Sequence, residues 1–334
     1  MRIKMYSVRE DEQPFIQAFA KKNNIEIDTV TYDLEFDTVD EVKGYDGISI
    51  LQTADMDDER VYKKLNEFGI KQISLRSAGY DMVNIPFANK YDITVTNIPA
   101  YSPHAIAEHA LMLSMYQIRN MPLSQNRIKQ QDFTWPGLIS NEISDLVVGV
   151  IGVGRIGSVY AKIMNALGAK VIGYDIKVNE ENKSFVNYVD SLEDLVKQAD
   201  LISMHVPLTE LTINMINKDI FKQMKDGVII VNTSRGQAIN TKDLIDAIDN
   251  NKVKSAGIDV VDHEAAYFAH NYQNKEIVDE SVKLVLDHPK IFVTPHIAFY
   301  THRAVENMVN ICLDSVVDII NNKKPYTIIE SQRK

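Results

Sequence analysis

Features that mark secreted, membrane-spanning and disulfide-stabilised proteins are missing from this sequence. Its 334 residues include a single cysteine, Cys312, so an intrachain disulfide framework is excluded and a reducing compartment is favoured. No run of about 18 or more apolar residues occurs, and we therefore expect no membrane span. The first residues, from Met1 to Tyr6, read as a short strand rather than as a secretory signal. Together these absences predict a cytoplasmic protein.

Excess basic charge and metal-ligand clusters are missing as well. Lys and Arg total 36 against 46 Asp and Glu, and the net charge of -10 argues against nucleic acid or an anionic membrane as the main partner. A small anionic substrate stays possible, because a few local Arg residues can override the overall field. His263 and His270 are not at a tight metal-ligand spacing and no Cys/His cluster exists, so we predict no metal.

What the sequence does contain is a regular alternation of short β-rich runs with helical patterns. The alternation predicts parallel sheets with crossover helices, and the chain length allows about two domains. A segment with two prolines, Asn97–Pro103, interrupts the pattern, which restarts at Leu146. We expect the residues between the next helix and this restart, 120–144, to be an irregular connecting arm. The predicted fold is therefore α/β, with two doubly wound parallel-sheet domains and a cleft between them.

The sharpest motif is the glycine-rich segment Val150–Gly157. An apolar strand precedes it, a helix follows, and a second strand ends at Asp175, at the spacing of a ribose-binding acid. Gly152 permits the tight turn, Gly154 allows the backbone to approach a pyrophosphate, and Gly157 allows close helix–strand packing. An acid at Asp175 accepts hydrogen bonds from ribose hydroxyls and repels a 2′-phosphate. We therefore predict a dinucleotide site that prefers NAD to NADP.

Three polar residues stand at the ends of predicted strands in the same half of the chain: Arg235, Glu264 and His296. Because the carboxyl ends of parallel strands face the ligand crevice, we expect these side chains to meet there. An Arg fork can hold a carboxylate and polarise a carbonyl, and a His can give a proton to a developing alkoxide. A carboxylate on the other imidazole nitrogen would stabilise the imidazolium. The trio predicts interconversion of a 2-keto acid and a 2-hydroxy acid. Taken alone, each of these residues is more simply explained as a surface or turn residue. Because all three follow predicted strands in the part of the chain that begins with the glycine motif, we favour a catalytic role for them.

Motifs over essentially the whole chain resemble the D-2-hydroxyacid dehydrogenase family, and within it the bacterial D-lactate dehydrogenase branch. The segments that carry the resemblance are Val95–Glu108, Val148–Gly157, Ser203–Pro207, Val231–Gly236, Asp259 with Glu264, and Thr294–Tyr300. The resemblance implies a flavodoxin-like substrate domain from residues 1–100 and 300–334, and a Rossmann-type NAD domain from residues 101–299. It also implies (R)-configured products, a homodimer, and Arg235, Glu264 and His296 as the catalytic trio.

The resemblance further implies two sets of binding residues. The first set holds the 2-keto or 2-hydroxy acid and comprises Leu51, Ala78, Gly79, Tyr101 and Phe299. The second set binds NAD and comprises Gly152, Gly154, Arg155, Ile156, Gly157, Asp175, Val206, Pro207, Thr212, Thr233, Ser234 and Asp259. His205 is expected to pack against cofactor or core, and His104 and His109 to serve the domain interface.

Two departures from the family pattern leave the substrate open. Ser77 stands where relatives often carry an Asn, so only backbone donors of that loop remain to bind a carboxylate. Leu51 stands where some lactate enzymes carry an aromatic residue, which favours relatives that accept branched 2-hydroxy acids. A 2-hydroxyisocaproate-type enzyme is therefore an alternative, and a non-catalytic NAD-sensing corepressor a more distant one. The chain leaves no room for the regulatory domain of many phosphoglycerate dehydrogenases, and formate dehydrogenases lack the acid at Glu264.

Overall fold

The computed structural model describes residues 1–52 and 54–332. The chain divides into two compact units. The first unit comprises Met1–Ser102 and Tyr300–Lys334, and the second comprises Pro103–Phe299. The chain thus leaves the first unit once, builds the second, and returns. Within the described residues no helix combines the length and apolar character that crossing a membrane requires.

The first unit is built on a five-stranded parallel sheet of order β2-β1-β3-β4-β5. Its strands are β1 (Arg2–Met5), β2 (Glu26–Thr29), β3 (Gly47–Ile50), β4 (Gln72–Leu75) and β5 (Thr94–Thr96). This is the flavodoxin-like order, so the predicted fold of this part is confirmed. The strand order reverses between β1 and β3, and ligands of such sheets bind beyond the carboxyl ends of the strands at this point.

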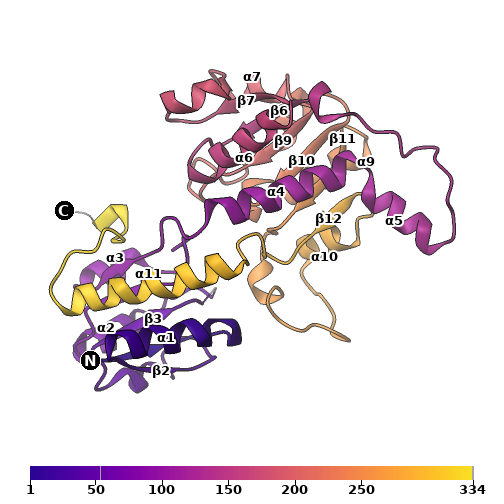
Figure 1. Cartoon of the computed structure of the whole chain (residues 1–334). Helices are drawn as coiled ribbons and strands as arrows, with labels where there is room; N and C mark the ends of the chain where they lie inside the picture. The colour runs from indigo at the N-terminus through magenta and orange to yellow at the C-terminus, as the bar shows by residue number, and fades with distance from the viewer. Residues whose placement is uncertain (53, 333–334) are drawn as a thin grey trace. The chain divides into compact units, whose positions relative to one another are not determined.

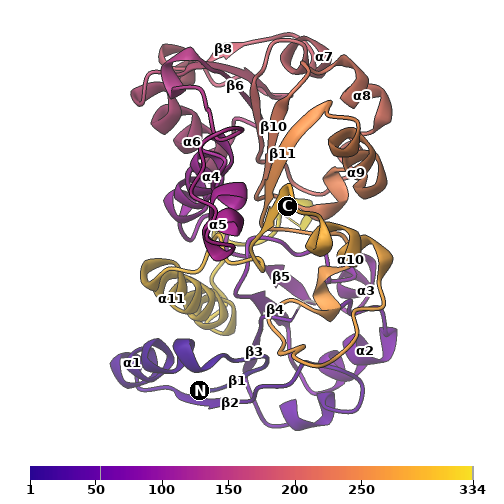
Figure 2. The ribbon, with the colours of Figure 1, turned by 90° about the vertical axis from the view of Figure 1, so that its right-hand side faces the viewer.

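Helices cover both faces of this sheet (Figure 2). On one face, α1 (Gln13–Asn23) and α11 (His302–Ile320) pack side by side and bury Ile16, Phe19 and Leu313 with strand residues. On the other face lie α2 (Glu59–Glu67) and α3 (Ile85–Lys90). Because both faces are covered, every residue of the central strands β3 and β4 is buried.

A buried ion pair lies inside the first unit. Arg76, which follows β4, and Glu12, in the 3₁₀ turn η1 (Glu10–Glu12), are both fully buried, with Nε and Oε1 2.8 Å apart. The remaining Arg76 donors reach the Ser49 hydroxyl and the Tyr6 carbonyl, each at 2.8 Å. Each partner therefore depends on the other, because an unpaired charge in this position would have no water around it.

The second unit contains a seven-stranded sheet of order β12-β11-β10-β9-β6-β7-β8 in which every neighbouring pair is parallel. The strands are β6 (Val147–Ile151), β7 (Lys170–Tyr174), β8 (Asn187–Tyr188), β9 (Leu201–Met204), β10 (Val228–Asn232), β11 (Val253–Ile258) and β12 (Ile291–Val293). The order reverses between β6 and β9, as in a Rossmann-type sheet, and this prediction too is confirmed. The glycine-rich segment follows β6 and therefore lies at the reversal.

Helices again flank the sheet on both faces (Figures 1 and 2). On one face, α4 (Pro103–Ile118) packs against α6 (Arg155–Ala166) and over β10 and β11. The helices whose apolar residues fill the core of the other face are α7 (Leu192–Val196), α8 (Lys218–Gln223), α9 (Thr241–Asp249) and α10 (Glu280–Asp287). The carboxyl ends of the strands are left to loops, and these loops carry the predicted site residues.

The expectation of an irregular arm over residues 120–144 is wrong in part. Helix α5 (Met121–Lys129) opens this segment, with a proline in its first turn. It buries none of its residues, so it lacks the apolar stripe by which helices are recognised in sequence. From α5 the chain continues in an extended loop away from the sheet (Figure 1). Short elements were also not predicted, namely α3, α10 and β8; Asp279 begins α10 by accepting a hydrogen bond from the Val282 amide.

The buried pair gives a stability prediction. Glu12→Gln should lower the free energy of unfolding of the first unit by about 3–5 kcal/mol, because Arg76 stays charged and buried without its partner. The matched control is Glu67→Gln, which removes an exposed pair with Lys63 (3.8 Å) and should cost at most about 1 kcal/mol. Urea unfolding of both variants measures the difference. Equal losses would show that the Glu12–Arg76 pair contributes no more than a surface contact.

Candidate active site

The glycine-rich loop is tightly packed at Gly152 and Gly157 and open at Gly154. Gly152 has φ +86°, and a Cβ there would lie 2.6 Å from the His205 carbonyl oxygen. A Cβ on Gly157 would lie 1.9 Å from the Gly152 carbonyl oxygen, so only glycine allows α6 to pack against the turn. A Cβ on Gly154 would meet nothing within 4 Å. The open side at Gly154, beside the N-terminus of α6 at Arg155 and Ile156, suits a phosphate group.

Asp175 follows β7 and is oriented by the backbone around it. Its Oδ2 accepts a hydrogen bond from the Val153 amide (2.7 Å) and its Oδ1 one from the Lys177 amide (2.9 Å). Each carboxylate oxygen keeps a further lone pair, so both remain able to accept a ribose hydroxyl. The carboxylate is half-buried at the end of its strand, where the ribose of a dinucleotide lies in this kind of fold.

The loops after β9 and β10 lie on the same edge of the sheet. The Thr212 hydroxyl closes the turn after β9 by donating to the Pro207 carbonyl (2.7 Å), and Val206 is half-buried beside it. After β10, the Ser234 hydroxyl is used internally, on Asn232 (2.7 Å). The Thr233 hydroxyl is buried and has no hydrogen-bond partner among the described residues. An orphaned buried hydroxyl is costly in a finished protein, so this one fits a bound cofactor.

His205, which follows β9, packs against the core residue Tyr160. Its Nε2 lies 2.9 Å from the Ser203 hydroxyl, and its ring contacts the Tyr160 ring at a tilt of 45°, with centroids 5.2 Å apart. Burial lowers the pKa of His205 to about 3. The ring is therefore neutral at physiological pH and unsuited to proton transfer, which agrees with the expectation that His205 packs rather than reacts.

The predicted catalytic trio comes from three neighbouring strands. Arg235 follows β10, Glu264 follows β11 and His296 follows β12. The structure joins two of the three directly: His296 Nδ1 lies 2.5 Å from Glu264 Oε1, and the other carboxylate oxygen of Glu264 accepts the Val261 amide at 2.5 Å. Arg235 is half-buried and its Nη1 donates to the Ser234 carbonyl (2.9 Å). With Nδ1 held by Glu264, Nε2 of His296 is the nitrogen available for proton transfer.

The loop that carries His296 is fixed by Asp259. The His296 backbone adopts the left-handed conformation (φ +54°), and its amide donates to the Asp259 carbonyl (2.9 Å). The fully buried Asp259 carboxylate accepts the amides of Ile297 and Ala298, each at 2.9 Å. Asp259 was predicted as a cofactor-binding residue. Its side chain contacts the loop that carries His296, and Oδ1 also lies 3.4 Å from His109 Nε2; these contacts were not foreseen.

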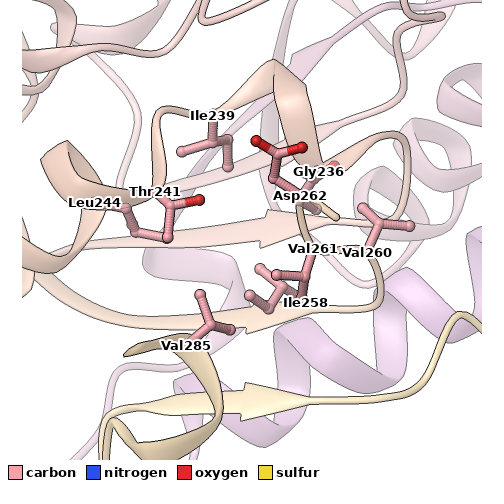
Figure 3. Close-up of a pocket in the computed structure, with 10 residues that line it drawn as sticks. Gly236, Ile239, Thr241, Leu244, Ile258, Val260, Val261, Asp262 and Val285 are labelled. Atoms are coloured by element: carbon pink, nitrogen blue, oxygen red, sulfur yellow. The ribbon is translucent and has the colours of Figure 1, made fainter. Parts of the chain in front are cut away.

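The loops of Arg235 and Glu264 touch at Gly236. A Cβ on Gly236 would lie 2.2 Å from the Val261 carbonyl carbon and 2.3 Å from the Asp262 amide nitrogen. Figure 3 shows the small cavity beside this contact, lined by Gly236, Val261 and Asp262 among others. Its volume of about 10 Å³ admits a water molecule but no substrate. The sequence analysis gave Gly236 no role of its own. Its position directly after Arg235 was the signal that could have indicated one.

The substrate residues predicted in the first unit lie after its strands. Leu51 follows β3 and is half-buried. In the loop after β4, the Ala78 carbonyl accepts from Asn97 Nδ2 and the Gly79 carbonyl from the Ser77 hydroxyl, both at 2.6 Å. Within the described residues no acceptor takes the amide protons of Ala78 and Gly79. These two amides are therefore able to bind a carboxylate.

Two other predicted residues each make a contact within their own unit. The Tyr101 carbonyl accepts a hydrogen bond from Asn307 Nδ2 (2.7 Å) in the first unit. In the second unit the Phe299 ring stands edge-on to the His296 imidazole, with centroids 6.4 Å apart. No group of three or more His, Cys, Asp or Glu side chains in the described part of the chain is arranged to hold a metal ion.

Comparison with known proteins agrees with this geometry. Residues 110–298 match the D-isomer specific 2-hydroxyacid dehydrogenase, NAD binding domain. The chain belongs to this family. It is 41% identical to a D-lactate dehydrogenase of Streptococcus pyogenes serotype M1, over 96% of this chain and 97% of that protein. It is 38% identical to a D-lactate dehydrogenase of Staphylococcus aureus over the same shares.

Two solved structures show that the likeness covers the whole fold. The D-isomer specific 2-hydroxyacid dehydrogenase of Lactobacillus delbrueckii ssp. bulgaricus, solved with NAD, has a TM-score of 0.87 and 40% identity over 99% of this chain and 100% of that one. A D-2-hydroxyisocaproate dehydrogenase has a TM-score of 0.88 and 35% identity over 98% and 99%. The predicted family and the NAD-binding domain are thereby confirmed.

The contact at Gly236 gives a prediction for this dehydrogenase. Gly236→Ala should lower kcat about 10- to 100-fold, because the loops of Arg235 and Glu264 must separate to admit the methyl group. The dissociation constant for NADH should stay near that of the unchanged protein. Gly257→Ala is the control, since the Cβ it adds to β11 lies 3.1 Å from Leu113 Cβ and comes no closer than 3.5 Å to a backbone atom, the Leu113 carbonyl oxygen. Steady-state kinetics with pyruvate give kcat for both variants. A Gly236→Ala variant with the kcat of the unchanged protein would contradict the steric argument.

Proposed function

We propose that the chain is an NAD-dependent D-lactate dehydrogenase, which reversibly reduces pyruvate or a related 2-keto acid to the (R)-2-hydroxy acid. The observation that carries the proposal is the hydrogen-bonded pair of His296 and Glu264 beside the Arg235 loop, on the sheet edge that also carries the glycine-rich turn. The named relatives support the assignment, because the first of them share about two fifths of their residues with this chain over nearly their full length.

His296 is the proposed proton donor and acceptor. Bound NADH supplies the hydride that reduces the keto carbon. As negative charge develops on the keto oxygen, Nε2 of a protonated His296 gives it a proton, and in the reverse direction neutral Nε2 takes that proton back. Glu264 holds Nδ1–H and places a negative charge beside the ring, so it orients the imidazole and stabilises the imidazolium.

The substrate carboxylate is the group that the remaining residues are proposed to hold. The Arg235 guanidinium would bind it and polarise the carbonyl. The amides of Ala78 and Gly79 and the side chain of Tyr101 are proposed as further carboxylate contacts, on the basis of the family resemblance and the unused amides. Leu51 and Phe299 would then face the substrate side chain.

NAD is proposed to bind along the edge formed by Gly152, Gly154 and Gly157. Arg155 and Ile156 open α6 beside the pyrophosphate, and Asp175 selects NAD by binding the ribose and repelling a 2′-phosphate. The walls of the remaining cofactor site are proposed to be Val206, Pro207, Thr212, Thr233, Ser234 and Asp259. The Thr233 hydroxyl supports this placement best, because it is buried and makes no hydrogen bond within the described residues.

A direct assay tests the function. The purified protein should oxidise NADH with pyruvate, form (R)-lactate, and work far less well with NADPH. His296→Ala should lose roughly 10²–10⁴-fold in rate, the usual range for positioned proton transfer. Absence of turnover with any 2-keto acid would favour a non-catalytic NAD-sensing protein. Faster turnover of 4-methyl-2-oxopentanoate than of pyruvate would favour the 2-hydroxyisocaproate-type enzyme, which Leu51 and one of the solved relatives make the second candidate.

A homodimer is part of the proposal. The loop after α5 exposes large apolar side chains: Phe133 is 73%, Trp135 85% and Ile139 90% exposed. Such a cluster on one projecting loop suits burial against a second copy of the chain. Sedimentation equilibrium should give twice the chain mass for the unchanged protein and a lower mass for Trp135→Glu. We also propose a cytoplasmic location, which the unpaired, buried Cys312 supports and cell fractionation tests.

The charge of Glu264 gives a pH prediction. Glu264→Gln removes the negative charge that faces Nδ1 of His296, so the protonated ring loses a stabilising partner. Keto-acid reduction, which needs protonated His296, should begin to fail at a lower pH than in the unchanged enzyme. Hydroxy-acid oxidation, which needs the neutral ring, should stay active to a lower pH. Both profiles therefore move in the same direction.

The control for this prediction is Glu276→Gln, which changes an exposed glutamate of the same loop and should leave both profiles in place. The profiles are measured as kcat/KM against pH in both reaction directions. Profiles of Glu264→Gln that stay put or move to higher pH would mean that another group stabilises the imidazolium.

A further inference from the structure

We propose that His109, on α4, is a positioning residue for His296 and acts through the Thr294 hydroxyl and the Asp259 carboxylate. The inference rests on the proposed function, because it assigns His296 the proton transfer. All four residues belong to the second unit, and they come from three different elements: α4, the loop after β11 and the loop after β12.

The first step of the argument is the crowding of donors around Asp259. Its Oδ1 accepts the Ile297 amide and its Oδ2 the Ala298 amide, both at 2.9 Å. The Thr294 hydroxyl lies 2.5 Å from Oδ1. Donors surround the carboxylate, which is the pattern of an ionised group that only accepts. The hydroxyl proton of Thr294 must therefore point at Asp259, since two oxygens at that distance repel without a proton between them.

The second step gives His109 its role. With its only proton directed at Asp259, the Thr294 oxygen can only accept from His109 Nε2, which lies 2.9 Å away. The same nitrogen lies 3.4 Å from Asp259 Oδ1. The imidazole thus holds the hydroxyl in place and offers positive polarity to a buried carboxylate. His109 is the outer end of a chain of hydrogen bonds that runs to Thr294, to Asp259 and then to the amides after His296.

The third step concerns the backbone of His296, which depends on this series of hydrogen bonds. This backbone is left-handed, a conformation that few residues other than glycine adopt and that neighbouring hydrogen bonds stabilise here. The bonds that impose it all end on Asp259 or Thr294. Without His109 the Thr294 hydroxyl keeps only its bond to Asp259, and the loop gains alternative conformations in which Nε2 of His296 is misplaced. A misplaced proton donor lowers kcat more than it changes binding of NADH.

The experiment compares substitutions that remove or keep the donor. His109→Phe keeps a ring but loses the hydrogen bond, whereas His109→Gln carries an amide donor near the position of Nε2. The control is Gln117→Leu, because Gln117 also lies on α4 and donates to a strand carbonyl, that of Ala256 (2.9 Å), without touching the His296 loop. Thr294→Val removes the middle of the chain, and Thr294→Ser keeps it.

Steady-state and binding measurements give the first readout. His109→Phe should lower kcat about 10- to 100-fold with the NADH dissociation constant unchanged, and His109→Gln should regain most of the loss. The double variant His109→Phe/Thr294→Val should be no slower than its worse single variant, because both break one chain. A His109→Phe enzyme with full kcat, a Gln variant as slow as the Phe variant, or losses that multiply in the double variant would each overturn the proposal.

Hydrogen exchange gives a readout that does not depend on activity. The amides of Ile297 and Ala298 should exchange faster in His109→Phe than in the unchanged protein, and should stay protected in Gln117→Leu and His109→Gln. Equal protection in His109→Phe would overturn the proposal even if its kcat were low. An unchanged protein without any 2-keto acid turnover would instead refute the proposed function, while the exchange data would still decide whether His109 holds the loop.

Discussion

The hydrogen bond between Nδ1 of His296 and Glu264 is the contact that the rest of the site serves. It joins loops from two neighbouring strands, and it leaves Nε2 of the ring for the substrate. A further hydrogen bond orients each partner. The Val261 amide donates to the second carboxylate oxygen of Glu264, and the His296 amide donates to the Asp259 carbonyl. Gly236 lets the Arg235 loop lie directly against the Glu264 loop. Parallel strands make this possible, because their carboxyl ends deliver residues distant in sequence to one edge.

Much of this arrangement could be predicted from sequence because it follows from local patterns and one topological rule. The alternation of β-rich runs with helical patterns predicted the strands, and the glycine-rich segment after β6 predicted the nucleotide-binding turn. The rule that ligands bind at the carboxyl ends of strands then singled out Arg235, Glu264 and His296 before any contact was known. The 2.5 Å contact between His296 and Glu264 agrees with the predicted partnership. Family resemblance added the substrate and cofactor residues that no periodicity reveals.

The parts that escaped prediction are those decided by tertiary contact. Helix α5 buries no side chain, so nothing in its pattern separates it from an irregular arm. His109 is one half-buried position on a long helix, and only the packing of α4 over β11 brings it to Thr294. The sequence indicates Asp259 only as a cofactor residue, and the bonds from its carboxylate to the amides after His296 are visible only in the structure. Which nearby donors a buried carboxylate binds depends on their positions in the folded protein, and these positions cannot be read from the sequence.

The tautomer of His296 tests the central claim most directly. If Glu264 binds Nδ1 as described, the neutral imidazole carries its proton on Nδ1 and presents an unprotonated Nε2 to the substrate hydroxyl. Long-range ¹H–¹⁵N correlation spectra of the protein labelled with ¹⁵N-histidine report which nitrogen is protonated, and the His296→Ala variant assigns the signal. We predict the Nδ1–H tautomer in the unchanged protein at high pH. An Nε2–H tautomer at His296 would contradict the account, because that nitrogen could then not accept the proton of a 2-hydroxy acid.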